Sequence, residues 1–579
     1  MQPFIFFYCP NMESQTSLYF LLLLGSLLTC ACREDLPTCL SQGGVTNITT
    51  SYNPDYLHFL YSSNQNLRVS KPFLNKPIAV VFPENKYQVQ TAIRCSRKGS
   101  WEIRLRSGGH SFEGLSSVAD GPFVIIDLMN LDRVTVDLES ETAWVEGGAT
   151  LGQLYNAIAT ASNRHGFSGG MCPTVGTGGQ ISGGGYGALI RKYGVAADHV
   201  VDAVLVDADG QLLDRKSMGK EVFWAIRGGG GGNWGVVVAW KIRLLEVPEN
   251  VTLFRIDKSG TTSQTASLWH KWQLVAPKLD ENFFLQVLVW PGTINTTEIF
   301  MFFTGFYLGP KASALAIISN AFPELGVTLQ DCKEMSWAEG VIFIMGDPNV
   351  RTVADLKNRF AYLKTFIKSK SDYVKVPIPL AGLKGALEIL SKLHKAILFL
   401  DPYGGINDRI KSDAIAFPHR AGNLYSIDCF LQWGEEDDGK SGEYLDGIRR
   451  LYEYMGAFYL VGPRAAYVNS VDLDLGVIDW SDSNMNGVET VEVARAWGEK
   501  YFLGNYDRLV HAKTLIDPNN VFRHPQIFLP RLVVKDVCII SRWDVCSFLF
   551  LLFYFLFFFV RCYLTLNLSV IVRNFILGS

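Results

Sequence analysis

A histidine directly after a glycine pair is the first feature of this sequence that could carry chemistry. His110 ends the run Arg106-Ser-Gly-Gly-His110, which follows the strand-like residues 101–106. Glycines after a strand expose consecutive N–H groups, and such a nest binds phosphate oxygens. His110 would then lie beside the molecule that bears the phosphates. The alternative is a tight turn with an incidental surface histidine.

A cysteine lies in a second glycine-rich segment. Cys172 belongs to residues 169–187, GGMCPTVGTGGQISGGGYG, where few side chains shield a thiol. Such a cysteine suits a bond to a flat ring. The alternative is a buried structural cysteine, which is a common role for this residue.

A third glycine run extends from Arg227 to Gly235. It contains a formal G-x-G-x-x-G at Gly230, Gly232 and Gly235. A dinucleotide-binding fingerprint of that type opens a helix. Here the strand-like residues 236–244, VVVAWKIRL, follow instead. The run is therefore no evidence for NAD.

The 53 glycines gather in clusters at 107–114, 147–152, 166–187 and 228–235. Clustered glycine indicates main chain held close to something, or turns with positive φ. A set of tight loops is one explanation. A large ligand lying against main chain is the interpretation we favour.

The elements that must position these residues are short. Runs of β-branched residues predict strands at 77–83, 123–128, 142–148, 200–210 and 234–244, with helices at 84–99 and 151–163. Further on we expect strands at 283–290 and 424–433, helices at 311–321 and 351–368, and a helical stretch over 490–526 that ends in a Pro/Asn turn. The pattern predicts an α+β fold with tightly packed domains.

Composition excludes several classes of protein. The 579 residues suffice for two or three domains, and 48% hydrophobic with 19% charged residues indicates a globular chain. The net charge is −3 and no basic stripe occurs, so no nucleic-acid partner is expected. Eleven cysteines include no C-x-x-C spacing, so no metal site is expected.

Both ends of the sequence are unusual. Residues 17–29 form an apolar core of signal-peptide length, without a preceding Lys or Arg and with Met12 as an alternative start, and cleavage after Ala31 is expected. Sequons at Asn47, Asn250, Asn295 and Asn567 fit export to the extracellular space or cell wall, with the vacuole as an alternative. Residues 545–560 are 16 uncharged residues, fewer than the roughly 20 of a membrane span. The tail is an anchor or does not belong to the natural protein, and we favour the second explanation.

Several long motifs, in order, resemble the berberine bridge enzyme-like family of plant flavoproteins. They include RSGGHSFEGLS (106–116), CPTVGTGGQISGGGYG (172–187), PRAAYVNSVDLDLG (463–476) and WGEKYFLGNYDRLVHAKTLIDPNNVFRHPQ (497–526), and the resemblance covers residues 36–530. It implies a two-subdomain FAD-binding module of the vanillyl-alcohol-oxidase (PCMH) type plus an α+β substrate domain. The implied divisions are a signal peptide (1–31), an FAD-binding domain (32–250), a substrate-binding domain (251–480), a C-terminal segment returning to the FAD domain (481–530) and an atypical hydrophobic tail (531–579).

The resemblance also implies a cofactor and its contacts. FAD would be bonded to both His110 and Cys172, and a disulfide would join Cys39 to Cys95. The remaining cofactor-binding candidates come from the same two glycine segments: Arg106, Ser107, Gly108, Gly109, Ser111, Gly176, Gly178, Gly179, Gly183, Gly184 and Tyr186. Val175 maps onto a position beside the flavin face that O₂ must reach, so a small residue there predicts reaction with oxygen.

Three positions depart from the family pattern. Phe112 and Ser470 stand where the family commonly has tyrosines, and Gln180 stands where many members have histidine. A strand over 424–428 occupies the stretch that holds a Glu base in some members, and alternation puts Ser426 and Asp428 on one face. Asp428, Tyr186 and Tyr467 are thus the candidate catalytic residues. For Asp428 the alternatives are an exposed strand residue or an internal hydrogen-bond partner.

The resemblance implies a secreted FAD-linked oxidase that acts on a small molecule and O₂. We expect hydride removal from an alcohol-type substrate, a carbohydrate or an aromatic alcohol, with H₂O₂ as product. The alternatives are an alkaloid-oxidising member of the family, or a catalytically weak extracellular flavoprotein that binds a glycan or small ligand. A monomer is expected, with no membrane association apart from the tail.

Overall fold

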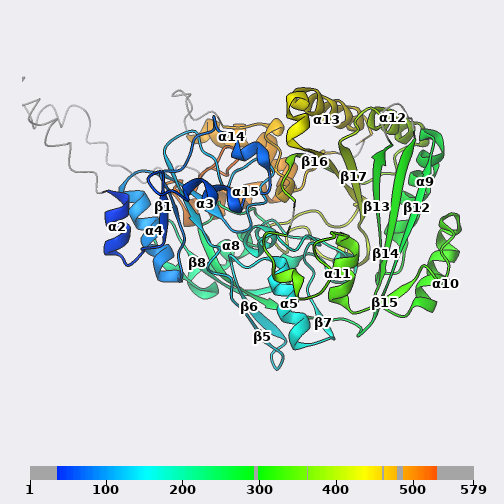
Figure 1. The fold of residues 1–579 in the computed structure, drawn as a ribbon, viewed down its shortest axis with the longest axis horizontal. Coiled ribbons are helices and arrows are strands. Elements are labelled where there is room, and N and C mark those ends of the chain that lie inside the picture. Colours follow the sequence, from blue (N-terminus) through cyan, green and yellow to red (C-terminus); the bar gives the residue numbers. More distant parts are fainter. Residues whose placement is uncertain (1–34, 293–297, 362, 459–461, 479–486, 531–579) are drawn as a thin grey trace, which may run out of the picture. The chain divides into compact units, whose positions relative to one another are not determined.

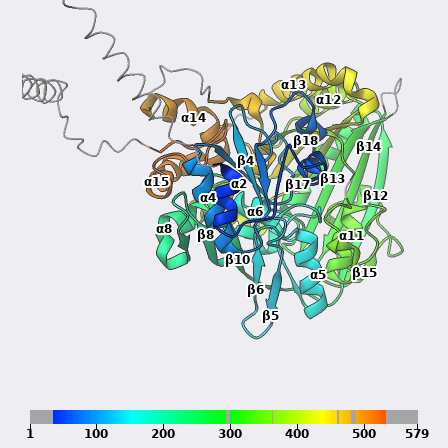
Figure 2. The same cartoon turned by 60° about the vertical axis from the view of Figure 1, so that its left-hand side comes forward.

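The computed structural model describes residues 35–292, 298–361, 363–458, 462–478 and 487–530. The signal and tail expected at 1–31 and 531–579 lie outside these residues, as do Asn295 and Asn567. All described residues fall in one unit that extends to Arg531. Figures 1 and 2 show its sheets and helices from two directions.

The first sheet contains the strand that leads into His110. Its order is β1-β2-β4-β3, with β2, β4 and β3 parallel and β1 antiparallel to β2. Every residue of β4 is buried, as expected for a central parallel strand covered on both faces. The strands are β1 Ile48–Thr50, β2 Ala79–Val81, β3 Glu102–Arg106 and β4 Phe123–Asp127, and the helices beside them are α2 Leu36–Gln42, α3 Tyr56–Ser62 and α4 Lys86–Lys98.

The second sheet is antiparallel with the order β5-β6-β10-β8-β9. Helix α5 follows β6 and begins at a capping box, in which Thr150 and Gln153 bond each other's main chain. The strands are β5 Val134–Asp137, β6 Thr142–Glu146, β8 Val200–Val206, β9 Leu212–Leu213 and β10 Val236–Arg243, and β7 His165–Gly166 pairs with β11 Leu245–Glu246. The helices are α5 Leu151–Ala161, α6 Thr177–Ser182, α7 Ile190–Tyr193 and α8 Arg215–Ala225.

The third sheet has seven strands in the order β15-β12-β14-β13-β17-β18-β16, all antiparallel. Its strands are β12 Val251–Gly260, β13 Phe283–Pro291, β14 Ile299–Tyr307, β15 Lys333–Met335, β16 Phe366–Val374, β17 Ala396–Pro402 and β18 Tyr425–Trp433. Helices α9 Thr262–Val275, α10 Lys311–Ala321, α12 Leu380–Leu390 and α13 Ser441–Gly456 join one face of it in a shared apolar core, while α11 Trp337–Met345 packs beside β12. The other face is left for the pocket described below.

The last described helices return to the first half of the chain. They are α14 Gly487–Phe502 and α15 Tyr506–Ile516, and α15 packs on α8. In both views the orange α15 lies beside the blue and cyan elements. The buried ammonium of Lys513 fixes this arrangement, because it donates to the Asn233 carbonyl at 2.8 Å and to Asp517 at 2.7 Å.

One expected helix is wrong. Among the described residues of 351–368, the one helix is a short 3-10 helix at Asp355–Lys357, and strand β16 begins at Phe366. The Asp355 carboxylate accepts from the amides of Arg351 and Thr352, which closes a turn instead of a helix. Pairing with β18 then overrides helical propensity after residue 365. The other predicted elements are present within a few residues of their expected bounds.

Candidate active site

A pocket of about 680 Å³ lies between the glycine-rich segments and the third sheet. We call its two sides the glycine wall and the sheet wall. The glycine wall contains Gly108, Gly109, Gly176, Gly178, Gly179, Gly230, Gly231 and Gly232. The sheet wall contains Gln286, Leu288, Ile367, Ser369, Ile397, Phe399, Asp401, Asp428, Phe430 and Gln432.

The glycine wall is main chain packed on main chain. A Cβ on Gly108 would lie 2.3 Å from the Gly176 nitrogen, and a Cβ on Gly109, where φ is +71°, would lie 1.9 Å from the Ser63 carbonyl oxygen. No side chain fits at either place. The two glycine segments that the sequence marks are therefore held in direct contact.

Other glycines of this wall face open space. A Cβ on Gly179 or Gly232 would meet no atom within 4 Å, although both residues line the pocket. Side chains there would project into the cavity. The volume and the bare main chain fit a large flat ligand with phosphates, which is the type of molecule that FAD represents.

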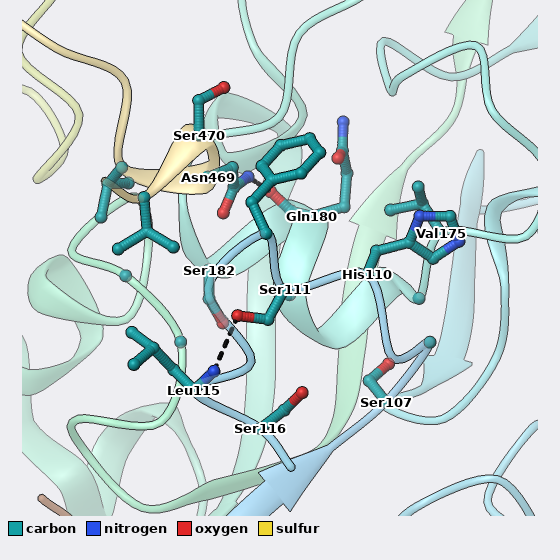
Figure 3. Close-up of a pocket in the computed structure, with 18 of the residues that line it drawn as sticks. Ser107, His110, Ser111, Leu115, Ser116, Val175, Gln180, Ser182, Asn469 and Ser470 are labelled. Carbon is teal, nitrogen blue, oxygen red and sulfur yellow. Dashed lines mark hydrogen bonds between the residues drawn. The ribbon is translucent and has the colours of Figure 1, made fainter. Parts of the chain in front are cut away.

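The side chains next to these glycines bind protein groups. The fully buried Arg106 guanidinium pairs with Asp127 at 2.6 Å and donates to the Leu60 carbonyl, so Arg106 anchors the loop and only its main chain is left for a ligand. Ser107 donates to the Gly147 carbonyl at 2.7 Å, and Ser111 accepts from the Leu115 amide (Figure 3). Gly183 packs against Asn469, and Gly184 takes a positive φ of 105° against Phe417.

His110 and Cys172 meet through one hydroxyl group. The Thr174 hydroxyl is 2.8 Å from Nε2 of His110 and 3.5 Å from Sγ of Cys172, and both residues line the pocket. Burial lowers the pKa of His110 to about 4, so its imidazole is neutral at neutral pH. Burial also raises the pKa of the Cys172 thiol.

Val175 follows Thr174 and lies beside His110 in Figure 3. It lines the pocket and is half-buried against the main apolar core. Gln180 also lines the pocket, and its carbonyl accepts from Asn469 at 3.2 Å.

The sheet wall follows from strand alternation. Asp428, Phe430 and Gln432 of β18 line the pocket, whereas the alternating residues Ile427, Cys429 and Leu431 belong to the core on the far face. Phe430 makes an edge-to-face contact with Phe112, whose ring centroid is 5.9 Å away. The pocket is thus apolar over much of this side.

Asp428 and Tyr186 form the polar part of the sheet wall. The Tyr186 hydroxyl donates to Oδ2 of Asp428 at 2.9 Å, and the Ser369 hydroxyl donates to Oδ1 at 3.4 Å. Burial raises the pKa of Asp428, while hydrogen bonds from Ser470, Tyr186 and Ser369 act the other way. Asp428 is therefore no freely exposed strand residue, and it faces the cavity.

Tyr467 supports Tyr186. Its hydroxyl accepts from the Gly185 amide at 3.1 Å and from the Asn469 side chain at 2.9 Å, and its ring centroid lies 5.1 Å from that of Tyr186. Burial raises the pKa of Tyr467, which therefore stays protonated at neutral pH.

Sequence reasoning missed two parts of the pocket. Asp401 of β17 lines it, buried at 3% exposure, and accepts from Gln286 at 2.7 Å. His524, Gln526 and Phe528 also line it. The third glycine run, one of the four clusters expected to lie against a large ligand, lines the pocket through residues 230–237. Nothing in the sequence pairs Asp401 with Asp428.

Away from the pocket, the disulfide that the resemblance implies is present. A disulfide joins Cys39 of α2 to Cys95 of α4, closing a loop worth about 4 kcal/mol by chain-entropy estimates. Asn47 and Asn250 are exposed. Among the described residues, no group of His, Cys, Asp or Glu is arranged to hold a metal ion. Within the same residues no helix has the length and apolarity needed to cross a membrane.

Comparisons with known proteins agree with this site. Residues 77–215 match the FAD binding domain family, and residues 466–526 match the family described as berberine and berberine like. The chain is 52% identical to berberine bridge enzyme-like D-2 of Nicotiana tabacum, over 85% of this chain and 90% of the relative. It is 48% identical to reticuline oxidase of Eschscholzia californica, over 90% and 96%.

Solved structures give the same result. The berberine bridge enzyme from Eschscholzia californica superimposes with a TM-score of 0.83 at 49% identity, covering 86% of this chain and 99% of that one. Phl p 4, a grass pollen allergen with glucose dehydrogenase activity, superimposes with a TM-score of 0.79 at 38% identity, covering 86% and 99%. Each of these likenesses covers at least 85% of this chain. This chain therefore belongs to the berberine bridge enzyme-like family of FAD-dependent oxidoreductases.

Proposed function

We propose that this protein is a secreted oxidase that removes a hydride from an alcohol-type substrate, a carbohydrate or an aromatic alcohol, and reduces O₂ to H₂O₂. Bound FAD supplies the hydride acceptor and the route of two electrons to oxygen. The observation that supports the proposal best is the Asp428 carboxyl in the pocket wall, hydrogen-bonded to Tyr186. It offers a base for the hydroxyl proton that must leave as the hydride leaves.

The residues of the sheet wall position that base. Burial brings the pKa of Asp428 up towards the operating pH, which favours proton transfer by a carboxylate. Tyr186 and Ser369 hold the two oxygens of Asp428 in place. The apolar side chains around it, such as Phe399 and Phe430, exclude water from the reacting atoms.

We further propose that FAD is bonded to both His110 and Cys172. Their proximity through Thr174 supports attachment at one end of a single ring system. The low pKa of His110 leaves one ring nitrogen unprotonated at neutral pH, which a bond to carbon requires. Ser107, Ser111 and the glycines of both segments that line the pocket are the proposed main-chain and hydroxyl contacts, whereas Gly183 and Gly184 do not line it.

Val175 supports reaction with oxygen. It is small, half-buried and next to the proposed attachment residues. A berberine bridge enzyme in which one glycine is replaced by alanine is described as a reticuline dehydrogenase, whereas the Eschscholzia and Papaver relatives are named reticuline oxidase. A single methyl group can therefore accompany a change of electron acceptor in a relative, and a residue no larger than valine at 175 leaves room for a small gas.

A specific observation favours a second candidate, oxidation of an alkaloid. Two carboxyl groups, Asp401 and Asp428, face a pocket whose other walls are largely aromatic and aliphatic. A protonated amine on an aromatic skeleton matches that combination of charge and surface. Relatives named reticuline oxidase and tetrahydroberberine oxidase are 48% and 43% identical to this chain.

One experiment tests both candidates. Purified holoenzyme would be mixed anaerobically with sugars, with monolignols and with benzylisoquinoline amines, and bleaching of the flavin would be followed. Bleaching by a sugar or monolignol supports the alcohol oxidase, and bleaching by an amine alone supports the alkaloid oxidase. If no compound bleaches the flavin while a glycan binds, the protein is the weakly catalytic binder considered from the sequence.

A further inference from the structure

A second cavity of about 710 Å³ is separate from the pocket described above, because none of the described residues that line it lines that pocket. It lies along helix α8, which packs on α15, and its volume is in the range of small-molecule sites. Five cationic side chains and three carboxylates line it. The cations are Arg215, Lys216, Lys220, Arg227 and Arg508, and the carboxylates are Asp202, Asp214 and Asp413.

Aromatic rings hold three of these arginines in place. The guanidinium carbon of Arg215 lies 4.7 Å from the centre of the buried Phe223 ring, and that of Arg227 lies 4.3 Å from it. The guanidinium carbon of Arg508 lies 3.9 Å from the centre of the buried Trp224 ring. Contact with a ring orients a guanidinium group without neutralising its charge. The cavity therefore presents positive charge in a fixed arrangement.

Arg227 has no ion-pair partner among the described residues. Its Nε donates to the Phe223 carbonyl at 3.0 Å, and the same part of the chain offers no acceptor to its two terminal nitrogens. Burial, followed by the charge of Arg215, lowers the pKa of Arg227. Asp198 acts the other way but is itself paired with Arg420 at 2.6 Å. The two terminal nitrogens of a guanidinium group match the two oxygens of a carboxylate.

The carboxylates of the cavity indicate what else the ligand must carry. Oδ1 of Asp202 accepts from the amides of Ala203 and Arg215, and Oδ2 has no donor among the residues that the structure describes. Asp413 is exposed. A hydroxyl group can donate to such oxygens, whereas a second anionic group is repelled by them. The lining therefore fits one carboxylate on a molecule with several hydroxyl groups, and it disfavours a polyanion.

We propose that this cavity binds a sugar acid, with the carboxylate paired to Arg227 and the hydroxyl groups donating to Asp202 and Asp413. The inference goes beyond the proposed function, because neither the flavin nor the sheet wall takes part. A free sugar acid and the acidic end of an oligosaccharide present the same groups to the cavity.

Titration calorimetry of the flavin-loaded protein tests the proposal with four probes: glucuronate, a disaccharide that ends in glucuronate, glucose and inorganic phosphate. Tighter binding of the disaccharide would identify an oligosaccharide end as the ligand, and equal affinity a free sugar acid. Glucose lacks the charge and phosphate lacks the hydroxyl groups, so both should bind at least about tenfold more weakly. Binding of glucuronate should weaken as salt is raised.

Variants locate the binding. Arg227→Met should lower the affinity for glucuronate at least about tenfold, since it removes a charge-assisted hydrogen-bonded pair and keeps an apolar side chain beside Phe223. Arg215→Met, at an exposed position, should lower it severalfold and decides the matter if the first variant misfolds. Arg133→Met is the matched control, because it removes the same charge from a side chain that is 78% exposed and does not line the cavity. Asp428→Asn should also bind as wild type does, which separates this cavity from the flavin pocket.

Three results would overturn the proposal. They are no binding of either sugar acid at millimolar concentration, equally tight binding of glucose or phosphate, and unchanged affinity in a flavin-loaded Arg227→Met protein. Because the titration measures no turnover, failure of the proposed oxidase activity would not affect it.

Discussion

The two walls of the pocket are built in opposite ways. The glycine wall presents main chain, and its tightest contacts, such as Gly108 on Gly176, leave no room for a Cβ. The sheet wall presents side chains from four strands, selected by alternation and cross-strand register. A main-chain wall suits a cofactor that every member of the family shares, whereas side chains can be exchanged to suit a substrate.

Two of the three departures from the family pattern follow this division. Phe112 and Ser470 lie beside the sheet wall, through the contacts of Phe112 with Phe430 and of Ser470 with Asp428. Gln180 is the exception, because it belongs to the glycine segment at 169–187 and lines the pocket there. The glycines of the glycine wall are intact. The glycine wall therefore supports the assignment of the cofactor, whereas the choice of substrate depends on the side chains of the sheet wall.

The largest expected effect comes from adding one methyl group to the glycine wall. Gly109→Ala should abolish folding and export, because its Cβ would overlap the Ser63 carbonyl at a positive φ. Gly179→Ala is the matched control: its Cβ meets no protein atom, so the protein should fold and be exported but load less FAD. Secreted yield and the flavin-to-protein absorbance ratio measure both, and normal loading in Gly179→Ala would exclude close contact of flavin with that wall.

A second prediction concerns the two proposed covalent bonds to the flavin, with the glycine wall unchanged. His110→Ala and Cys172→Ala should each keep flavin after acid precipitation, since the other bond remains. The double variant should release all of its FAD into the supernatant. Free FAD from the wild-type protein would contradict double attachment.

The glycine wall could be predicted from sequence because its glycines form visible runs, such as 106–110 and 172–187. The contacts that require Gly108 and Gly109 come from Gly176 and Ser63, which are distant in the chain, so the sequence shows the runs and not their partners. His110 and Cys172 were found because they lie in these runs. The pairing of Cys39 with Cys95 was implied by the resemblance and is confirmed.

The sheet wall could not be predicted in the same way. Asp401 and Asp428 are adjacent only because β17 pairs with β18 in one register, and register is a tertiary property. Arg106 illustrates the same limit: it lines the pocket, but its guanidinium is bound by Asp127 on the parallel strand β4, a pairing that the sequence did not indicate. The helix predicted at 351–368 is also absent for a tertiary reason, because the residues from Phe366 onward pair with β18 as a strand.

A third prediction tests the sheet wall. Asp428→Asn should remain yellow and reduce its flavin at least tenfold more slowly, since positioned bases contribute about 10² to 10⁴. The wild-type rate should fall as pH drops through the raised pKa of Asp428, because protonation removes the base. Stopped-flow reduction across pH checks both, and a variant with the wild-type rate would transfer the role to Tyr186 or solvent.

The smallest expected effect is on the oxygen half-reaction alone. Val175→Ile adds one methylene at the edge of the glycine wall, so reoxidation of the reduced enzyme by air-saturated buffer should slow severalfold. Reduction by substrate should not change, because Val175 is not on the sheet wall. Slow reoxidation of the wild-type protein would instead make it a dehydrogenase.

The residues at the end of the described chain have a consequence for biosynthesis. His524, Gln526 and Phe528 line the same pocket as Gln65 and Asn66, so the pocket exists only after some 460 residues between them have been made and folded. An unfinished chain has no closed compartment in which to retain a flavin. Bound flavin, seen as yellow colour, would thus indicate a chain that has been translated at least to residue 528. A cell that exports only flavin-loaded molecules would therefore export only such chains.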